Sequence, residues 1–459
     1  MTSVIRSKSF GLGLLLAGLA LGDAPSALAE IRATGKNGLR TEVNGQRGGL
    51  CNQGICRIGG GTNAGKNKFH RFKEFDTRGA IQRVEFDTGG KRNLIVGVTS
   101  ANGSWINKAV EMSSKANLFF LSPGGIHLGK GADFINVPKL SLSTADQLNF
   151  SEGVFDVVGS TAEAVQDFRT NPLPGVFGMR RRELEEPVVL AEGELPGIHL
   201  DGINISLAEE LLVDAPGGQV DVEGSRLEVG GEEIGGRIAL TGEAIRVDGE
   251  SELMASGRKG GGLIEVGGSW QNSDASVRQA ITSQIDEGAV LDASAIEDGD
   301  GGEIVVWSDI TNPDSLTTVA GTLLASGGTK GGDGGEIETS GFELDVAGID
   351  VDARANEGEN GLWLLDPYDY VLDSSDTGLI QEVLIAGTSV TISTVASSNA
   401  LGSSSIEADL DADGDGAIDN PDEGGTIIVN GSISVPAGGS ATGDLTLDAD
   451  KDIQINAAL

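Results

Sequence analysis

A pair of glycines followed by a short aliphatic strand recurs through the second half of the chain. The pattern Gly-Gly-x-(Ile/Val) begins at Gly217, Gly235, Gly261, Gly301, Gly334 and Gly424. Several pairs follow another short strand that ends in alanine, at Ala255, Ala293, Ala325 and Ala353. The spacing of these alanines drifts from 38 to 32 to 28 residues. A unit of strand and glycine turn that recurs about every 20 to 40 residues is typical of a solenoid.

Within each unit, apolar and acidic side chains alternate. Ile264 and Val266 flank Glu265, for example, so aliphatic groups fall on one face of the strand and carboxylates on the other. Alanine and glycine at the strand ends allow tight corners. The sequence therefore predicts an all-β chain folded as a parallel β-helix with an acidic exterior, right-handed by the crossover rule. A β-sandwich or a propeller is the alternative, but propeller blades keep a stricter period with hairpin turns.

Composition and charge exclude several other classes of protein. Of 459 residues, 71 are glycine and 4% are aromatic, which does not suit a helical enzyme, whereas 39% hydrophobic residues are too many for a disordered acidic tail. Residues 31–182 carry 21 Lys and Arg against 12 Asp and Glu, but residues 183–459 carry 9 against 55. The acidic part should bind nucleic acid poorly, and the basic part lacks the aromatics and motifs of a nucleic-acid reader. No nucleic-acid partner is expected.

The first residues have the order of a secretory signal peptide: basic residues, a short apolar stretch, and a small-x-small site ending at Ala29. The apolar stretch is short for a membrane anchor, which is the alternative, and no other stretch could form a transmembrane helix. The expected organisation is a signal peptide (1–29), an N-terminal domain (30–175), a linker (176–190), acidic β-helix repeats (191–400), an acidic insertion (401–425) and a further coil (426–459).

Cys51 and Cys56 are the two cysteines of the chain. In an exported protein, a pair at this spacing predicts a disulfide that closes a small loop. A zinc site would need two more ligands, and the three histidines, His70, His127 and His199, are scattered.

A strand break at Ser122-Pro123-Gly124-Gly125 separates two apolar stretches. Proline cannot donate to a strand ladder and glycine adopts positive φ, so this break predicts a corner between two faces of a solenoid.

These residues also resemble a known family. The sequence Ser122-Pro123-Gly124-Gly125-Ile126, with Ser143-Thr144-Ala145-Asp146 downstream, is similar to the N-terminal secretion domain of two-partner-secreted exoproteins, the filamentous haemagglutinin family. Both asparagines of the family's Asn-Pro-Asn-Gly-Ile turn are replaced here. The upstream run through Asn67, Phe69, His70, Phe72 and Phe75 resembles a second motif of that domain. The cysteine pair looks like the loop disulfide of cyanobacterial members, and Trp363–Pro367 resembles the high-molecular-weight adhesin branch.

The resemblance implies a secreted or cell-surface β-helical exoprotein of adhesin type rather than an enzyme. Such a protein passes through the periplasm and crosses the outer membrane through a β-barrel transporter with POTRA domains, which recognises the N-terminal domain. Surface glycans or proteins of a host or neighbouring cell are the implied ligands. His70 and the phenylalanines are expected in the core, as their burial preference indicates. The positive charge of residues 31–182 could orient the encounter with the transporter.

Five carboxylates are spaced as in a calcium loop: Asp411, Asp413, Asp415, Asp419 and Asp422, with Gly416 at the turn. Their positions match 1, 3, 5, 9 and 12 of an EF-hand loop, although position 12 holds Asp instead of Glu and no clear helices flank the loop. The alternative is a solvated acidic loop. Calcium binding outside the cell is expected to help the acidic region fold. The Gly-Asp clusters at 297–303 and 329–336 indicate ordinary turns.

A parallel β-helix polysaccharide hydrolase or lyase, with aspartates that converge on a groove, is the alternative function. Against it, the acidic positions alternate evenly along the strand exteriors, as solubility alone requires, and no catalytic motif stands out.

Overall fold

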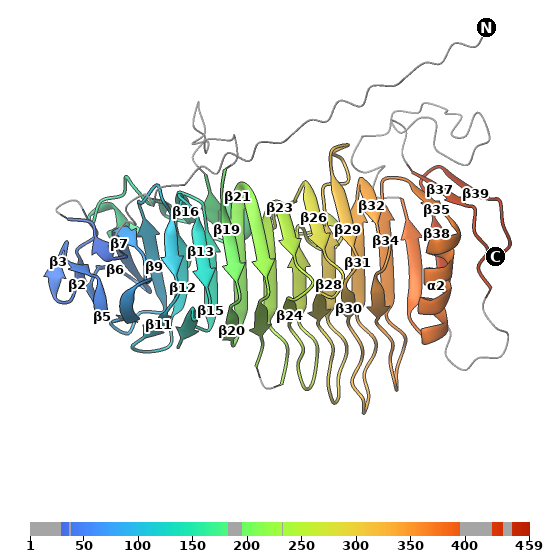
Figure 1. Cartoon of the computed structure of the whole chain (residues 1–459), viewed down its shortest axis with the longest axis horizontal. Coiled ribbons are helices and arrows are strands. Elements are labelled where there is room, and N and C mark those ends of the chain that lie inside the picture. Colours follow the sequence, from blue (N-terminus) through green and yellow to red (C-terminus); the bar gives the residue numbers. More distant parts are fainter. Residues whose placement is uncertain (1–28, 36–37, 182–194, 232, 395–424, 435–442) are drawn as a thin grey trace, which may run out of the picture.

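Short strands stack in register into one elongated column (Figure 1). The computed structural model describes residues 29–35, 38–181, 195–231, 233–394, 425–434 and 443–459. The predicted signal peptide before Ala29, most of the predicted linker and the predicted calcium loop lie outside these ranges. The long ladders run parallel, so the predicted parallel β-helix is confirmed.

Each regular coil contributes one strand to each of three faces. Face one consists of β7 (Asn67–Phe75), β9 (Asn93–Val98), β12 (Asn117–Leu121), β15 (Lys139–Ser143), the first parts of β21 (Glu210–Glu223) and β23 (Arg237–Val247), β25 (Leu263–Val266), β28 (Glu303–Trp307), β31 (Glu336–Gly341), β34 (Leu362–Pro367), β36 (Ser389–Ser393) and β38 (Leu445–Asp448). Face two consists of β10 (Ser104–Ile106), β13 (Ile126–Gly129), β19 (Leu195–Asp201), the later parts of β21 and β23, β26 (Thr282–Ile285), β29 (Leu316–Val319) and β32 (Glu343–Asp345).

Face three has an N-terminal and a C-terminal part. The first is β5 (Gln53–Gly60), β8 (Ala80–Phe86), β11 (Ala109–Met112) and β14 (Asp133–Ile135). The second is β20 (Asn204–Leu207), β22 (Arg226–Val229), β24 (Glu252–Met254), β27 (Val290–Asp292), β30 (Thr322–Leu324) and β33 (Asp350–Asp352). A small parallel sheet of β35 (Tyr370–Leu372), β37 (Thr426–Val429) and β39 (Asp452–Ile455) follows near the C-terminal end.

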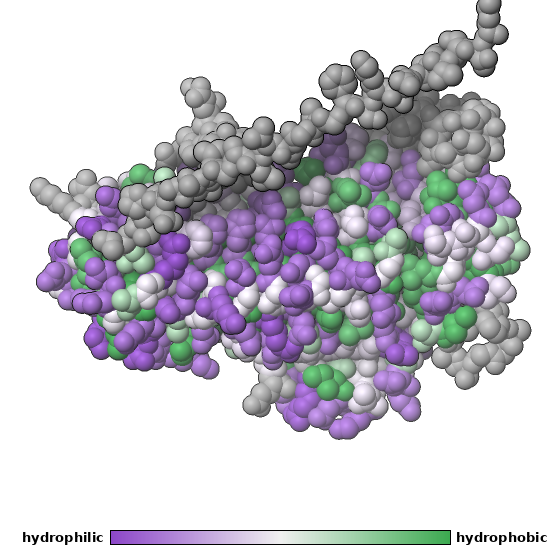
Figure 2. All heavy atoms as spheres, in the orientation of Figure 1, coloured by the Kyte–Doolittle hydropathy of each residue, from purple (hydrophilic) through white to green (hydrophobic). Residues whose placement is uncertain are grey.

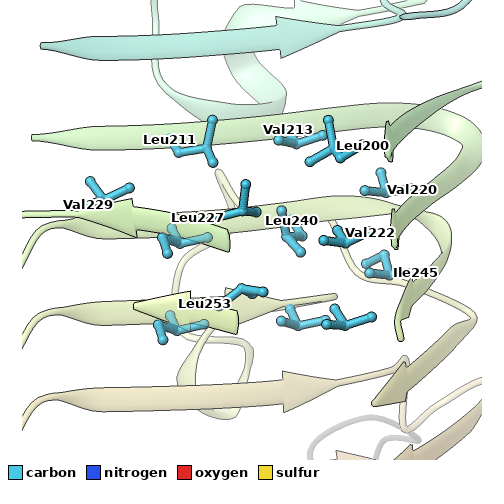
Figure 3. Packing of buried hydrophobic residues seen from close by; sticks show 14 of the residues in the cluster. Leu200, Leu211, Val213, Val220, Val222, Leu227, Val229, Leu240, Ile245 and Leu253 are labelled. Atoms are coloured by element: carbon cyan, nitrogen blue, oxygen red, sulfur yellow. The ribbon is translucent and has the colours of Figure 1, made fainter. Parts of the chain in front are cut away.

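Aliphatic side chains fill the interior because the register places like residues above one another. On face one, Ile238, Ile264, Ile304 and Ile337 are successive partners and all are fully buried. Figure 3 shows the same stacking for leucines and valines of the three faces, including Leu211, Leu227 and Leu253. Burial of each such side chain is worth about 1.5–3 kcal/mol, so this lining holds the column together.

The glycine pairs that begin at Gly235, Gly261, Gly301 and Gly334 form one kind of corner, between face three and face one, whereas the pair at Gly217 lies at the corner between faces one and two. The second glycine donates its N–H to the carbonyl oxygen of the alanine that ends the preceding strand: Gly302 to Ala293 at 2.7 Å and Gly335 to Ala325 at 2.7 Å. A Cβ on the first glycine would meet the alanine carbonyl of the next coil, at 2.0 Å for Gly301. Both glycines are therefore required, which explains the repeat.

An antiparallel cap covers the N-terminal end. Its strands are β1 (Ile31–Ala33), β2 (Thr41–Val43), β3 (Gln46–Arg47), β4 (Leu50–Cys51) and β6 (Thr62–Ala64). A disulfide joins Cys51 to Cys56, which confirms the predicted pairing.

Residues 144–181 leave the column at the corner after β15. This excursion contains an antiparallel sheet of β16 (Gln147–Phe150), β17 (Gly153–Asp156) and β18 (Met179–Arg180), with the short helices η1 (Ala164–Asp167) and α1 (Gly175–Gly178). The column itself continues, because β13 pairs directly with β19 and β15 with β21. The coils before and after the predicted linker therefore share one ladder, and the predicted domain boundaries stay a prediction.

One longer helix, α2 (Ser374–Ala386), was not expected from the sequence. Asp373 caps it by accepting hydrogen bonds from the backbone of Ser375 and Asp376, and the Asp376 side chain bonds back to Asp373. Gly387 ends the helix with φ of 103°. Its Ile380, Val383 and Leu384 are buried with the core of the last coils.

Candidate functional site

Strand β7 carries the upstream motif and divides its side chains between two cores. Phe69 points away from the column and packs against the excursion, with ring centroids 5.4–6.1 Å from those of Phe150, Phe155 and Phe168. Phe72 and Phe75 face the column interior. The motif therefore holds the excursion against the first coils.

His70 also lies in the interior and is fully buried, as expected. Neither ring nitrogen has a hydrogen-bond partner among the described residues. Burial, reinforced by the charge of Lys68, lowers the pKa of His70 to about 3, so the ring is neutral at ordinary pH. Gly61, with φ of 81°, lies against the ring, and a Cβ there would be 2.8 Å from it. His70 is thus a packing residue enclosed by a glycine turn.

Asn67 begins a ladder of buried amides along face one. Asn93 donates to the Asn67 side chain at 2.8 Å, and Asn117 donates to Asn93 at 3.0 Å. Asn67 itself donates to the carbonyl oxygens of Phe168 and Thr170 at 2.8 and 2.7 Å. This motif residue therefore joins three successive coils to the end of the excursion.

The downstream motif forms the predicted corner between faces one and two. Gly125 donates to the Ser122 carbonyl at 2.9 Å and has φ of 107°, with Pro123 between them. Gly124 lies against the corner of the preceding coil, where a Cβ would be 2.3 Å from the Ser100 carbonyl. Ile126 then enters the core fully buried. The replaced asparagines have not removed the turn, because proline and glycine are sufficient for it.

Ser143 and Thr144 stand where the excursion leaves the column, and the next coil fastens them. The carboxylate of Asp214 accepts from the Ser143 hydroxyl at 3.2 Å, and the Asp214 carbonyl accepts from Thr144 N–H at 3.1 Å. Arg181 donates to Thr144 Oγ1 at 3.0 Å and to the Pro216 carbonyl at 2.9 Å. These partners were not predicted from the sequence, although the Pro-Gly-Gly after Asp214 repeats the corner pattern that follows Ser122.

We call the coils from β19 onward the shaft. A loop at residues 268–281, which we call the strap, reaches from the shaft to the excursion. Arg278 of the strap pairs with buried Asp214 at 3.1 Å and donates to the Met179 carbonyl at 3.2 Å. Val176 N–H donates to the Ser276 carbonyl at 2.6 Å. The strap thus links the N-terminal domain to later coils, beside the shared ladders.

Two carboxylates that were expected on the exterior are buried on face one, and the strap contacts one of them. Glu265 and Glu338 alternate with aliphatic residues as predicted, but they are 3% and 0% exposed. Glu338 accepts from Gln271 N–H at 2.8 Å and from the Ser340 hydroxyl at 2.9 Å. Burial raises the pKa of Glu338 to about 8. A carboxylate sealed in this way is out of reach of a polymer substrate, which disfavours the hydrolase alternative at this position.

The predicted calcium ligands, Asp411 to Asp422, lie outside the described residues. Within the described part of the chain, no group of three or more His, Cys, Asp or Glu side chains could hold a metal ion. Among the helices of that same part, none is long and apolar enough to span a bilayer.

A parallel β-helix whose first coils carry an antiparallel cap, these corners and an attached excursion defines a β-solenoid with an elaborated N-terminal end. Residues 40–165 match the family described as TPS secretion domain, the domain of two-partner secretion. The chain therefore carries a two-partner secretion domain, as the resemblance implied. Proteins with this domain are secreted across the outer membrane by a partner transporter.

Among solved structures, the chain is similar to the HMW1 secretion domain from Haemophilus influenzae. The identity is 18%, the TM-score is 0.31, and the match covers 73% of this chain and 98% of that chain. Because this identity and this TM-score are low, we assign the fold from the strand pairings described above and not from the similarity. No curated protein matches the chain significantly.

Proposed function

We propose that this chain is an exoprotein whose first coils are recognised by an outer-membrane β-barrel transporter with POTRA domains, and whose acidic shaft acts at or beyond the cell surface as an adhesin. The observation that carries the proposal is the secretion-domain match at residues 40–165. In this account the shaft works by binding and not by catalysis.

The surface of the N-terminal domain offers two kinds of support for recognition. Strands β3 and β17 lie at the edges of their sheets, so a receptor strand could be added to either. Exposed Lys73, Lys115 and Lys130 belong to the basic part of the chain, and such charges speed encounter with an acidic surface.

Export measurements test the proposal. The full chain with its signal peptide is expressed in a Gram-negative host with and without a POTRA-barrel transporter encoded beside it, and the protein in the medium is quantified. We expect release only with the transporter, and reduced release when Lys73, Lys115 and Lys130 are changed to Glu. The matched control changes three basic shaft residues, Arg226, Arg246 and Arg354, to Glu. Equal release without any transporter would refute the proposal.

The calcium site is a separate proposal that rests on the spacing of Asp411, Asp413, Asp415, Asp419 and Asp422. A loop of this kind in an extracellular protein binds calcium with a Kd of about 0.1–1 mM. Calorimetry of the full chain should show one site, lost in an Asp411→Asn/Asp415→Asn variant. Absence of heat at millimolar calcium would remove the site, and equal refolding rates with and without calcium would remove its role in folding.

A further inference from the structure

Loops at the corner between faces three and one protrude as a row along the shaft (Figure 1). We call this row the fin; its loops are residues 230–236 (of which 232 is not described), 255–262, 293–302, 325–335 and 353–361. Each loop leaves one coil after face three and returns to face one of the next. In Figure 2 the protruding region carries hydrophilic residues with hydrophobic ones among them.

Backbone hydrogen bonds join each loop of the fin to the next. Lys259 N–H donates to the Glu233 carbonyl at 2.6 Å, and Ile296 N–H donates to Gly257 at 2.9 Å. Lys330 N–H donates to the Glu297 carbonyl at 2.7 Å. The side chains of Lys259 and Glu233 also form an ion pair at 2.7 Å, as do those of Lys330 and Glu297. The ladder therefore continues outside the column, and the fin is a preorganised surface that loses little entropy on binding.

Charge is unevenly distributed along the fin. The second loop is basic through exposed Arg258 and Lys259, whereas the fifth loop exposes Glu357 and Glu359 beside Arg354 and carries a single net negative charge. Between them, the third loop exposes Asp298 and Asp300, and the fourth exposes Lys330 and Asp333, whose charges cancel. A second copy that lies antiparallel, about a two-fold axis between the third and fourth loops, would place the basic second loop of each copy against the acidic fifth loop of the other.

Apolar surface lies at the centre of the same arrangement. Ile296 in the third loop is 55% exposed. A two-fold axis between the third and fourth loops would bring the two copies of Ile296 within about one coil step, 4.8 Å along the column. Such a contact would remove both isoleucines from water.

We propose that the fin is a self-association surface, on which a second copy of this chain docks antiparallel. Arg258 and Lys259 of one copy face Glu357 and Glu359 of the other, and the Ile296 side chains meet near the axis. The fin is narrow, so the interface falls in the small class that gives weak, transient pairs. Shafts crowded side by side would pair through it, and the proposal does not depend on the export route.

Charge exchange tests the pairing. Sedimentation of the full chain is measured up to about 1 mM, a range set by the weakness of small interfaces. The wild type should associate, whereas Arg258→Glu/Lys259→Glu and Glu357→Lys/Glu359→Lys should each be monomeric alone. Mixing the two variants should restore association, because each acidic second loop then faces a basic fifth loop.

A further variant shows whether a loss of association could come from misfolding. Ile296→Asn keeps every charge of the fin and should also weaken association, with an unchanged melting temperature. A monomeric wild type throughout the range, variants that associate as the wild type does, or a mixture that stays monomeric would overturn the proposal. Association with an added acidic or basic protein, without self-association, would overturn it in favour of a different partner.

Discussion

The ring of His127 stacks on the ring of His199, with centroids 4.8 Å apart and planes inclined by 9°. The two residues are register partners on β13 and β19, so one belongs to the secretion domain and the other to the shaft. His199 also bonds to Asp221 of the next coil at 2.9 Å, which raises the pKa of His199. One column of side chains therefore crosses the junction of the two regions.

Changing a corner glycine should destabilise the column locally. Gly301→Ala places a Cβ 2.0 Å from the Ala325 carbonyl, and overpacking of this kind costs about 1–3 kcal/mol. Gly378 on α2 is the control, because nothing lies within 4 Å of its Cβ position. Gly378→Ala should leave stability unchanged or raise it by up to about 1 kcal/mol. Urea unfolding measures both, and similar losses in the two variants would contradict the corner assignment.

The carboxyl groups of Glu338 and Glu303 should make the folded state less stable as pH rises. Burial raises the pKa of Glu338 to about 8 and that of Glu303 to about 7, so the folded state holds protons that the unfolded state releases above about pH 4.5. The contribution of these two groups to the free energy of unfolding therefore decreases between about pH 4.5 and 8.

Glu338→Gln should flatten that decrease, since glutamine cannot ionise. Glu336→Gln is the control, because Glu336 is an exposed neighbour on the same strand and the substitution replaces the same type of side chain. Melting temperatures at pH 5, 6, 7 and 8 compare the two. Identical slopes in both variants would show that Glu338 is not the origin of the pH dependence.

Replacing His70 by an apolar residue should not weaken the fold. Its nitrogens have no partners to lose within the described part of the chain, and a buried polar group without partners costs about 1–3 kcal/mol. Because the pKa of His70 falls to about 3, the contribution of this residue to stability is lost as pH falls below about 6.5, where the unfolded ring gains a proton. His70→Leu should therefore gain more in melting temperature at pH 5 than at pH 8. A large loss at both values would mean that the ring has a partner in the folded protein.

Asn67→Ala should loosen the excursion while the column remains. The change leaves the Phe168 and Thr170 carbonyls without their donor and interrupts the ladder to Asn93. Limited proteolysis should then cut within residues 144–181 several times faster than in the wild type. Asn63→Ala, at an exposed position on β6, is the control and should cut at the wild-type rate. Equal cleavage rates in the two variants would show that Asn67 does not hold the excursion in place.

The regular coils could be predicted because each repeats a local pattern. Alternation around Glu265 and the glycine pairs determine strand faces and corners from neighbouring residues alone. The same locality explains the correct assignment of the Ser122–Gly125 turn and the disulfide.

What could not be predicted depends on contacts between distant segments. Glu338 has the pattern of an exterior residue, and only the strap, more than fifty residues earlier, makes it buried. The Gly-Asp clusters look like ordinary turns until the register stacks them into the fin. For α2 a local signal was present, in the capping pair Asp373 and Asp376 and in Gly387, but the strand repeats around it concealed the helix.

Cross-linking across the junction tests the central claim, that the secretion domain and the shaft form one column. In His127→Cys/His199→Cys the two residues lie on adjacent strands, about 4.8 Å apart, within the range that a disulfide spans. In the control, His127→Cys/Asp221→Cys, they are two strands apart, at about 9.6 Å, which is too far. Mass spectrometry after mild oxidation should find the new bond in the first variant and not in the second. A first variant that stays reduced, or equal bonding in both, would contradict a single continuous column.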